Sequence, residues 1–455
     1  MTPTTLGVLL KGIAQVNNEE VVIKTVVTDS RKVTEGSLFV AIVGENLDGH
    51  DYLEDAFVRG AAAALVSKKN DNISGTQIVV GDTKNAHILI GKNYIEQFSP
   101  LVVGVTGSVG KTTTKEMISL ILATSGDTVK NEGNLNNEIG LPQTMFEIGK
   151  DTKFAVLEMG MNNLGDIRKL TMAAKPYAAV ITTIGIAHIE FLKTRENILK
   201  AKLEILEGMP QDGIVAINGD DKLLLSAKDT VSQKCVTFAI ENTDSDVIAK
   251  NIIIDNNLTK FVIADKEYGD YEVILPALGN HNVLDALSAY AITTRIGISP
   301  TEAPKALSNY QPTGMRQNIV NFKGITVIED CYNANPDSMN AALGALSIKP
   351  VKGIRIAVLG DMLELGEYTE KEHRNLVMYA ASCGIDVLLC IGDNMKVAVE
   401  AAQVTSISSV KWFSNKEELA DCLVKTVKED DLILFKASRG IKLEDVLQIF
   451  YERYV

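Results

Sequence analysis

The chain has 455 residues, more than one hydrophobic core usually serves, so we expect two to four domains and take three as the working number. Its hydrophobic fraction of 46% and charged fraction of 23% are those of an ordinary globular protein and exclude a disordered chain. A net charge of −13 argues against a general binder of nucleic acid or of anionic membranes, so small molecules are the expected partners.

The cysteines and the N-terminus indicate where the protein works. The cysteines are odd in number, scattered, and form no C-x-x-C pair: Cys235, Cys331, Cys383, Cys390 and Cys422. This pattern argues against a disulfide framework and a thiolate metal site, and we expect reduced cysteines that lie mostly in the core. The N-terminus lacks a basic region followed by an apolar one, and no apolar run approaches the roughly 18 residues of a spanning helix. We therefore expect no membrane insertion and a cytoplasmic location.

Residues 1–98 predict a small α/β domain. Short β-like runs such as GSLFVAIVG and AAAALVS alternate with helical stretches at 52–60 and 85–97. The domain is expected to end near Ser99-Pro100, because the residue before a proline is pushed out of helical geometry.

Residues 99–314 predict a second, central domain. Apolar strands, LVVGVTG, FAVLEMG, YAAVITTIG and GIVAING, are each followed by a turn and a longer helical pattern. This alternation is typical of a largely parallel sheet covered by helices, as in P-loop ATPases. Residues 244–271 predict further strands, and a helical pattern at 282–297 leads into a turn-rich passage at 299–314.

Residues 315–455 predict a third domain. Strand patterns GITVIEDC, RIAVLGD, VLLCIGD and LILFKAS again alternate with helical patterns, which indicates a Rossmann-like, doubly wound domain with functional loops at the carboxyl ends of its strands. The expected fold class is therefore α/β with three domains.

A glycine loop follows the first strand of the central domain. It reads Thr106, Gly107, Ser108, Val109, Gly110, Lys111, Thr112 and Thr113, and a helical pattern follows it. Glycines let backbone N–H groups turn toward phosphate oxygens, Lys111 adds a positive charge, and the Thr112 hydroxyl can bind Mg²⁺. The loop is a variant, since Val105 stands where the strict pattern has glycine. ATP is the expected ligand, and the loop alone fits a kinase, a GTPase or a ligase.

Further motifs follow the glycine loop in the middle of the chain and narrow the class of enzyme. TGSVGKTTTKEM is followed in order by GNLNNEIGLP (133–142), LEMGMN (157–162), AHIEF (187–191), AKLEI (201–205), GNHNVLDA (279–286) and MRQ (315–317). In kind and order these motifs resemble those of the Mur ligase family, ATP-dependent enzymes that form amide bonds, and the deviation at Val105 belongs to that family's version of the loop.

The resemblance implies two Mg²⁺ positions. Glu158 closes an apolar strand, where a carboxylate can hold Mg²⁺ near the γ-phosphate, although a surface glutamate is the alternative. His188 matches the family's histidine at a second metal position, although a lone histidine often serves packing or capping. Lys202 matches the lysine that is carbamylated by CO₂ in the family, and a carbamate could join Thr112 as a metal ligand. Lys200 is the neighbouring alternative, but the register of the motif favours Lys202.

The resemblance also assigns residues to the nucleotide. Asn136 and Asn137 match a polar pair near the substrate and nucleotide, and Asn282 matches a nucleotide contact. Asp285, however, stands where the family usually carries a second asparagine. Two charged residues further along complete the set: Arg316, expected to reach the γ-phosphate as a catalytic group with Lys111, His188 and Lys202, and Asp330, near the nucleotide. An exposed salt bridge is the alternative for both.

The flanking segments bear on the substrates. Residues 27–52 resemble the uridine-nucleotide domain of two family branches, with Ser30 and Arg31 as candidate contacts. The third segment, with IEDCYNANPDSM (328–339), VLGDMLELGE (358–367) and KASRGIKLEDV (436–446), resembles the branch that adds D-alanyl-D-alanine. It has no D-N-P-R motif typical of a ligase for diamino acids. Candidate substrate contacts are Asn333, Asn335, Asp337 and Ser338, which could also form a turn and helix cap.

The resemblance implies ligation of D-alanyl-D-alanine to UDP-N-acetylmuramoyl-tripeptide through an acyl phosphate, with ADP and phosphate released, by a monomer whose third domain swings toward the phosphate loop. Alternatives are the preceding ligase, which adds a diamino acid to the dipeptide, a folylpolyglutamate-type ligase, which would lack the N-terminal domain, and an inactive nucleotide-binding scaffold. Intact Lys111, Glu158, His188 and Lys202 count against the scaffold.

Overall fold

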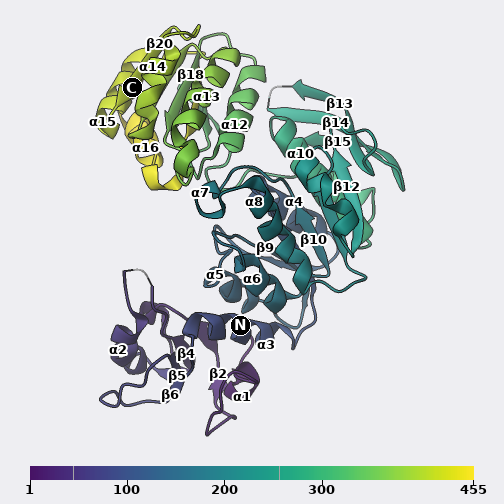
Figure 1. Ribbon diagram of the computed structural model, residues 1–455, viewed down its shortest axis with the longest axis vertical. Coiled ribbons are helices and arrows are strands. Elements are labelled where there is room, and N and C mark those ends of the chain that lie inside the picture. The colour runs from purple at the N-terminus through teal and green to yellow at the C-terminus, as the bar shows by residue number, and fades with distance from the viewer. Residues whose placement is uncertain (45, 256, 455) are drawn as a thin grey trace.

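A computed structural model describes residues 1–44, 46–255 and 257–454, and it divides into three sheet-containing segments that follow one another along the chain. In Figure 1 the N-terminal segment lies at the bottom, the middle segment at the centre and right, and the third segment at the top. The fold class predicted from the sequence, an α/β protein with three such parts, is confirmed, while the boundaries at residues 98 and 314 remain predictions.

The N-terminal segment is built on a four-stranded parallel sheet in the order β3-β4-β5-β6. Helix α3 begins after Asp82, whose side chain accepts hydrogen bonds from two backbone amides, and packs against helices of the middle segment. The elements are β1 (Thr4–Thr5), α1 (Leu6–Leu9), β2 (Val22–Ile23), β3 (Thr25–Val27), β4 (Ser37–Val40), α2 (Leu53–Val58), β5 (Ala61–Val66), β6 (Gln77–Val79) and α3 (Thr83–Ile95), with 3-10 turns η1 (Ser30–Lys32) and η2 (Gly49–Tyr52).

The middle segment holds a nine-stranded sheet in the order β15-β14-β13-β12-β11-β10-β7-β9-β8. Strands β7 to β13 pair in parallel, and β14 and β15 join as antiparallel strands. The sequence predicted further strands at 244–271 but not their direction. The strands are β7 (Leu101–Thr106), β8 (Asp127–Lys130), β9 (Thr152–Glu158), β10 (Ala178–Ile181), β11 (Ile214–Asn218), β12 (Lys234–Ala239), β13 (Val247–Asp255), β14 (Leu258–Asp265) and β15 (Gly269–Leu275).

Helices cover both faces of this sheet, because its central strands are apolar on both sides. In β10, Ala178 and Val180 pack into the core shared with α4 and α10, whereas Ala179 and Ile181 pack into the opposite core shared with α6 and α8. The helices are α4 (Lys111–Leu122), α5 (Gly140–Met145), α6 (Asp166–Ala174), α7 (Ile189–Leu192), α8 (Arg195–Leu203), α9 (Lys222–Ser226), α10 (Asn280–Arg295) and α11 (Glu302–Leu307), with turns η3 (Glu204–Gly208) and η4 (Lys228–Thr230). Helix α11 lies in the passage predicted to be rich in turns, where the sequence predicted no helix.

The third segment holds a six-stranded sheet in the order β16-β17-β21-β18-β19-β20, parallel except for β16. The sequence did not predict β16, which pairs antiparallel with β17 at the edge. The elements are β16 (Asn318–Phe322), β17 (Ile325–Glu329), α12 (Pro336–Ile348), β18 (Arg355–Gly360), η5 (Gly366–Tyr368), α13 (Thr369–Ser382), β19 (Val387–Ile391), η6 (Asn394–Lys396), α14 (Val397–Ala402), β20 (Ser409–Phe413), α15 (Lys416–Thr426), β21 (Leu432–Lys436), η7 (Arg439–Ile441) and α16 (Glu444–Arg453).

All five cysteines are free, as the sequence predicted. Only Cys331 and Cys390 are buried, so the expectation that most cysteines lie in the core was wrong: the other three sit at partly exposed positions. Among the described residues, no helix is long and apolar enough to cross a membrane.

A buried ion pair ties the antiparallel strands to α10. The Arg295 guanidinium binds both carboxylate oxygens of Asp265, with Nη2 2.8 Å from Oδ1, and the two side chains are 3% and 0% exposed. Removing one partner of a buried pair leaves an uncompensated charge in the core. We expect Arg295→Ala to lower the free energy of unfolding by about 3–5 kcal/mol, measured by urea denaturation.

The matched control is Lys260→Ala, which breaks the exposed pair between Lys260 and Asp255. We expect it to cost less than about 1 kcal/mol, because solvent screens exposed pairs. Equal losses in the two variants would contradict the role assigned to Arg295.

Candidate active site

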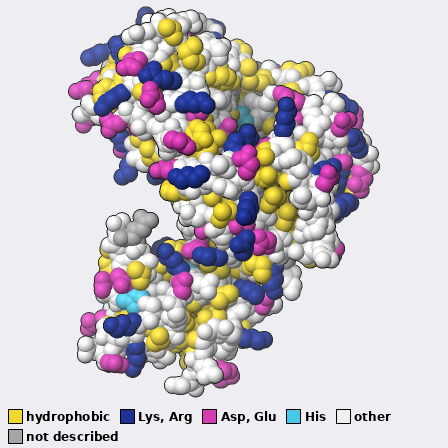
Figure 2. Space-filling model, viewed as in Figure 1, with side chains coloured by type: hydrophobic (Ala, Val, Ile, Leu, Met, Phe, Trp, Pro, Cys, Tyr) yellow, Lys and Arg dark blue, Asp and Glu magenta, His cyan; other side chains and the backbone are white. Residues whose placement is uncertain are grey.

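Two adjoining cavities open around the glycine loop. The larger, of about 640 Å³, contains Lys111, Glu158, His188 and Lys202 in its lining, and the smaller, of about 130 Å³, is lined by residues of β12, α10 and the third segment. Both cavities share one set of lining residues from the middle and third segments: Val109, Gly110, Arg316, Tyr332, Asn333 and Ser338. Figure 2 shows the molecule hollowed between the N-terminal and third segments.

The loop between β7 and α4 has the conformation that its glycines permit. Gly107 and Gly110 have φ values of 153° and 84°, and a Cβ on either would clash, with Thr182 and Asp285 respectively. The loop is anchored to the neighbouring strand connection, since Ser108 N donates to Thr183 O at 2.9 Å. Gly110 directly precedes α4, so the loop opens onto the N-terminus of that helix, an arrangement suited to binding phosphate.

Two lysines lie close together beside the glycine loop, with Lys202 buried and Lys111 half-buried. Lys111 Nζ donates to Gly107 O at 2.9 Å, and Lys202, on α8, is 2% exposed. Burial lowers the pKa of Lys111. It lowers the pKa of Lys202 well below the ordinary value, the charge of Lys111 lowers it further, and Glu158 opposes both effects. Lys200 is exposed, so the structure distinguishes it from Lys202.

Glu158 lies at the end of β9 beside the loop, 2% exposed. Its Oε2 accepts a hydrogen bond from Thr112 Oγ1 at 2.8 Å and its Oε1 accepts one from Asn136 Nδ2 at 2.8 Å. A carboxylate beside a hydroxyl suits Mg²⁺. Among the described residues, no group of three or more His, Cys, Asp or Glu side chains could hold a metal. A cation at this position therefore depends on Thr112 or on a modified Lys202 as well as on Glu158.

His188 and Asn137 also line the larger cavity. His188 has a φ of 63° and directly precedes α7, and its Nδ1 lies 2.6 Å from Glu364 Oε2 of the third segment. Asn137 Oδ1 accepts hydrogen bonds from the backbone amides of Ile139 and Gly140 at 3.0 and 2.9 Å. Asn137 thus has a structural role at the start of α5 in addition to facing the cavity.

The smaller cavity brings together the predicted nucleotide residues Asn282, Arg316 and Asp330. Asn282 Nδ2 donates to Leu278 O at 2.7 Å and to Gln317 Oε1 at 2.8 Å. The Arg316 guanidinium stacks 4.1 Å from the ring centre of Tyr332. Asp330 is not in an exposed salt bridge: its Oδ2 lies 2.8 Å from Nζ of Lys436, which is 3% exposed.

The residues of the predicted glycine loop take different positions. Ser108, Val109, Gly110, Lys111 and Thr112 line the larger cavity, and Thr113 lines the smaller one. Thr106 is buried, with Oγ1 donating to Met159 O at 2.9 Å, and together with Gly107 it supports the loop from behind.

The predicted substrate residues of the third segment cluster at the start of α12. Asn335 and Ser338 form a capping box there, so the alternative interpretation as a helix cap is correct for these two side chains. Asn333 Oδ1 accepts from Arg439 N at 3.3 Å, and Asp337 Oδ2 accepts from Ile186 N of the middle segment at 3.3 Å. Asn333, Asn335 and Ser338 line the larger cavity, so substrate binding remains a prediction for them.

Ser30 and Arg31 lie apart from both cavities, in η1 of the N-terminal segment. Ser30 is 6% exposed, and Arg31 pairs with Asp29 at 2.8 Å while its side chain stays 83% exposed. The larger cavity is lined on this side by Lys84, next to the N-terminus of α3, so a substrate that contacted Arg31 would extend along the N-terminal segment.

Sequence reasoning missed several residues of the site. Lys436 and Tyr332 line the smaller cavity, and Glu364 contacts His188. The only signal for Lys436 was its place at the end of a strand in the KASRGIKLEDV motif (436–446). Nothing local in the sequence connects Glu364 to His188.

A glycine loop on a parallel sheet, with a carboxylate, a hydroxyl, a half-buried lysine and a buried lysine around it, defines a P-loop enzyme that uses a nucleotide. The chain matches the Mur ligase family, catalytic domain, over residues 22–103, the Mur ligase middle domain over 105–293, and the Mur ligase, glutamate ligase domain over 315–439. The chain belongs to the Mur ligase family.

Particular relatives cover the whole chain. It is 38% identical to UDP-N-acetylmuramoyl-tripeptide–D-alanyl-D-alanine ligase of Bacillus subtilis over 99% of this chain and 98% of that one. A crystal structure of MurF from Acinetobacter baumannii superimposes with a TM-score of 0.92 at 30% identity, covering 100% of each chain. MurF ligase from Thermotoga maritima in complex with ADP gives 0.86 at 29% identity, covering 94% and 97%.

Asp285 gives the site a dependence on pH. It is buried against the glycine loop, accepts from Thr114 Oγ1 at 3.0 Å, and burial raises its pKa to about 8. A raised pKa means that the stability contributed by the bound proton is complete below the unfolded pKa near 4 and is lost as pH rises through about 8. We expect Asp285→Asn to melt higher than the native protein at neutral and alkaline pH, with a difference that grows between about pH 4 and 8.

Thermal unfolding across this pH range checks the prediction. A change of ~1 kcal/mol in the free energy of unfolding shifts the Tm of a domain the size of the middle segment by about 2–4 °C. A pH-independent difference between Asp285→Asn and the native protein would contradict the burial of a protonated carboxyl.

Proposed function

We propose that the protein joins D-alanyl-D-alanine to UDP-N-acetylmuramoyl-tripeptide, with ATP converted to ADP and phosphate, in the synthesis of peptidoglycan precursors. One observation supports this most directly: the glycine loop, Glu158 and Lys202 face Arg316 and Asn333 across joined cavities, in a chain that matches D-alanyl-D-alanine-adding ligases over nearly its full length. The proposal includes a monomer working in the cytoplasm.

The linings of the two cavities suggest which reactant binds in each. The smaller cavity offers Phe238 and Leu284 as apolar walls and Asn282, Asp330 and Lys436 as polar groups, which suits a base and ribose. The residues shared by both cavities sit where the phosphates would lie. The larger cavity, which extends to Lys84 and carries Asn136 and Asn333, would take the peptide carboxylate and the incoming amine.

The expected reaction has two steps. A carboxylate oxygen of the tripeptide attacks the γ-phosphorus and the bond to ADP breaks; the amine nitrogen of D-alanyl-D-alanine then attacks the acyl carbon, and phosphate leaves. Lys111, at the loop, and Arg316, held against Tyr332, are placed to neutralise the charge that develops on the transferred phosphoryl group. Their positions are fixed before reaction, so little reorganisation is needed.

Mg²⁺ fits at Thr112 and Glu158, with His188 and Lys202 as the residues for a second position, and when bound it would neutralise phosphate charge. Lys202 can contribute only if its charge is reversed, because a buried ammonium repels a cation. The low pKa of its amine favours the neutral form, which is the form that attacks CO₂. We propose that Lys202 carries a carbamate.

The activity test measures phosphate release with ATP, Mg²⁺ and UDP-N-acetylmuramoyl-tripeptide, in the presence of D-alanyl-D-alanine, single amino acids or no amine. We expect release and a pentapeptide product with D-alanyl-D-alanine alone, because the acyl phosphate needs that amine to turn over.

Other outcomes separate the alternatives. Turnover with UDP-N-acetylmuramoyl-dipeptide plus a diamino acid would identify the preceding ligase of the pathway. Absence of turnover with either pair, in protein that still binds ATP, would support an inactive nucleotide-binding scaffold.

The carbamate is tested at Lys202. We expect Lys202→Ala to lower kcat by at least about 100-fold, since a preorganised charge at the reacting phosphate is lost, and high bicarbonate together with short carboxylic acids should partly restore activity. Lys200→Ala, two residues away on the exposed side of the same helix, is the matched control and should retain full activity. Full activity in Lys202→Ala would refute the carbamate.

A further inference from the structure

The segment from Thr183 to Glu190, which follows β10, joins the glycine loop to the third segment. At one end Thr183 O accepts from Ser108 N at 2.9 Å, and Gly185 N donates to Ser108 Oγ at 2.9 Å. At the other end Glu190 N donates to Glu364 O at 3.2 Å. We call this segment the bridging loop. It touches the phosphate-binding residues and the third segment within eight positions of sequence.

The contact between His188 and Glu364 is the polar centre of this junction. His188 Nδ1 lies 2.6 Å from Glu364 Oε2. Both residues have left-handed backbone conformations, each with a φ of 63°. Left-handed conformations of residues other than glycine persist when surrounding contacts fix them, so this pairing is held by the tertiary structure on both sides.

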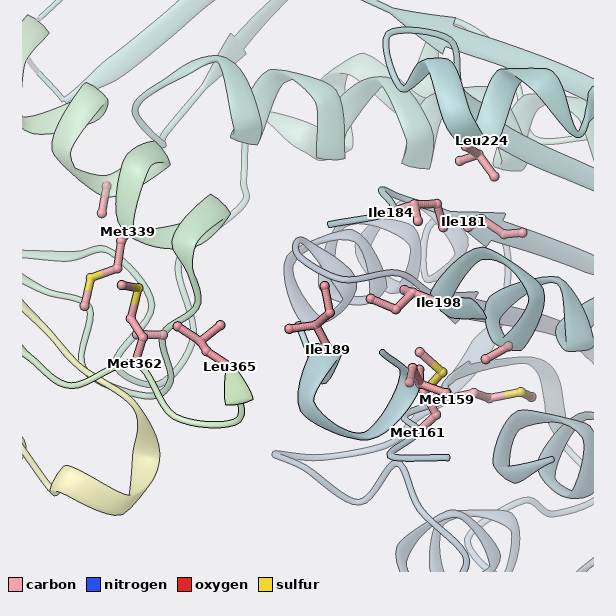
Figure 3. Close-up of a cluster of buried hydrophobic side chains, with 14 of the residues drawn as sticks. Met159, Met161, Ile181, Ile184, Ile189, Ile198, Leu224, Met339, Met362 and Leu365 are labelled. Atoms are coloured by element: carbon pink, nitrogen blue, oxygen red, sulfur yellow. The ribbon is translucent and has the colours of Figure 1, made fainter. Parts of the chain in front are cut away.

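Apolar packing seats the two backbones against each other. Ile189 of the bridging loop and Leu365, Met362 and Met339 of the third segment belong to one buried cluster, and Figure 3 shows Leu365 on the side of the third segment that faces Ile189. Gly366 lies so close to Glu190 that a Cβ there would approach Glu190 Cα to 3.3 Å. The position of Glu364 relative to His188 is therefore set by packing as well as by charge.

We propose that Glu364 is a positioning residue for His188. Its carboxylate fixes the ring orientation and favours a proton on Nδ1, which leaves Nε2 with its lone pair free as the ligand. A histidine that binds a metal commonly presents its other ring nitrogen to a carboxylate, and that partner orients the ring and raises its basicity. His188 lines the larger cavity while its Nδ1 faces Glu364, so the arrangement fits this role.

The alternative is a plain ion pair between segments. Glu364 is 43% exposed and His188 23%, and a pair with that much exposure adds little stability. A purely stabilising role would thus be weak, whereas an orienting role requires no large pair energy. The positioning role has a structural consequence: the second metal position is complete only while the third segment is docked on the bridging loop. This inference rests on the proposed function, which supplies the metal.

The test counts bound Mn²⁺ by electron paramagnetic resonance in the full-length protein with a non-hydrolysable ATP analogue and UDP-N-acetylmuramoyl-tripeptide. We expect two Mn²⁺ per native chain. In Glu364→Ala the first should bind as before, at Thr112 and Glu158, and the second about 10–100-fold more weakly. Glu364→Gln, which keeps an oxygen that can accept from Nδ1–H, should recover most of the second affinity.

Glu367→Ala, an exposed glutamate in the following turn, is the matched control and should leave both affinities unchanged. An unchanged second affinity in Glu364→Ala, or only one Mn²⁺ in the native protein, would overturn the assignment. Equal weakening of both sites would also overturn it, because it would indicate a general defect and not an effect on His188. Native turnover with D-alanyl-D-alanine, measured separately, distinguishes these results from failure of the proposed function.

Discussion

The site depends on the burial of charge at the end of one parallel sheet. Lys111 and Lys202 approach each other beside Glu158, where solvent is largely excluded. Two cations and one anion leave an excess of positive charge there, which burial alone would make unfavourable. The excess is relieved in two ways: the lysines lose part of their affinity for protons, and the cavity is ready to accept anionic phosphates. The same charge cluster thus makes Lys202 chemically reactive and the loop a phosphate site.

The surrounding architecture keeps this cluster in place. Strand β7 is an inner strand of the nine-stranded sheet, flanked by β10 and β9, so the glycine loop, Glu158 and the bridging loop all leave the sheet at neighbouring strand ends. Asn131 fixes the end of β9 by bonding both backbone groups of Glu158, at 2.8 and 3.0 Å. Such fixed positions matter for catalysis, because charge stabilisation is effective only where donors need not rearrange.

The sequence predicted the parts of this arrangement that are local in the chain. The order of strand and helix, the glycine loop and the approximate end of β9 follow from apolar periodicity and turn residues. Edge strand β16 was missed because its residues, Asn318–Phe322, are mostly half-buried and carry no clear alternation. Short helix α11 was missed because Pro304 and the flanking turn residues dominate its local pattern. Lys202 and His188 were identified as candidate site residues by their resemblance to family motifs and not by periodicity.

What the sequence could not supply were partners from distant segments. Lys436, at the end of β21, contacts Asp330, which directly follows the neighbouring strand β17. Glu364 of the third segment contacts His188 of the middle segment. Burial decides the character of the Lys436–Asp330 pair, because the same residue types at an exposed surface would form the ordinary salt bridge that the sequence equally allowed.

Asp285 stands where the family usually carries an asparagine, and its surroundings explain how an aspartate is accommodated there. A Cβ on Gly110 would clash with its carboxyl, so the carboxyl occupies the space that the left-handed glycine leaves open beside the loop. An ionised carboxylate there would oppose bound phosphate, whereas a protonated one, favoured by burial against the opposing hydrogen bond from Thr114, is nearly isosteric with asparagine. The raised pKa therefore lets an aspartate stand in a position suited to a neutral amide, and the phosphate site keeps its positive balance as long as that proton stays bound.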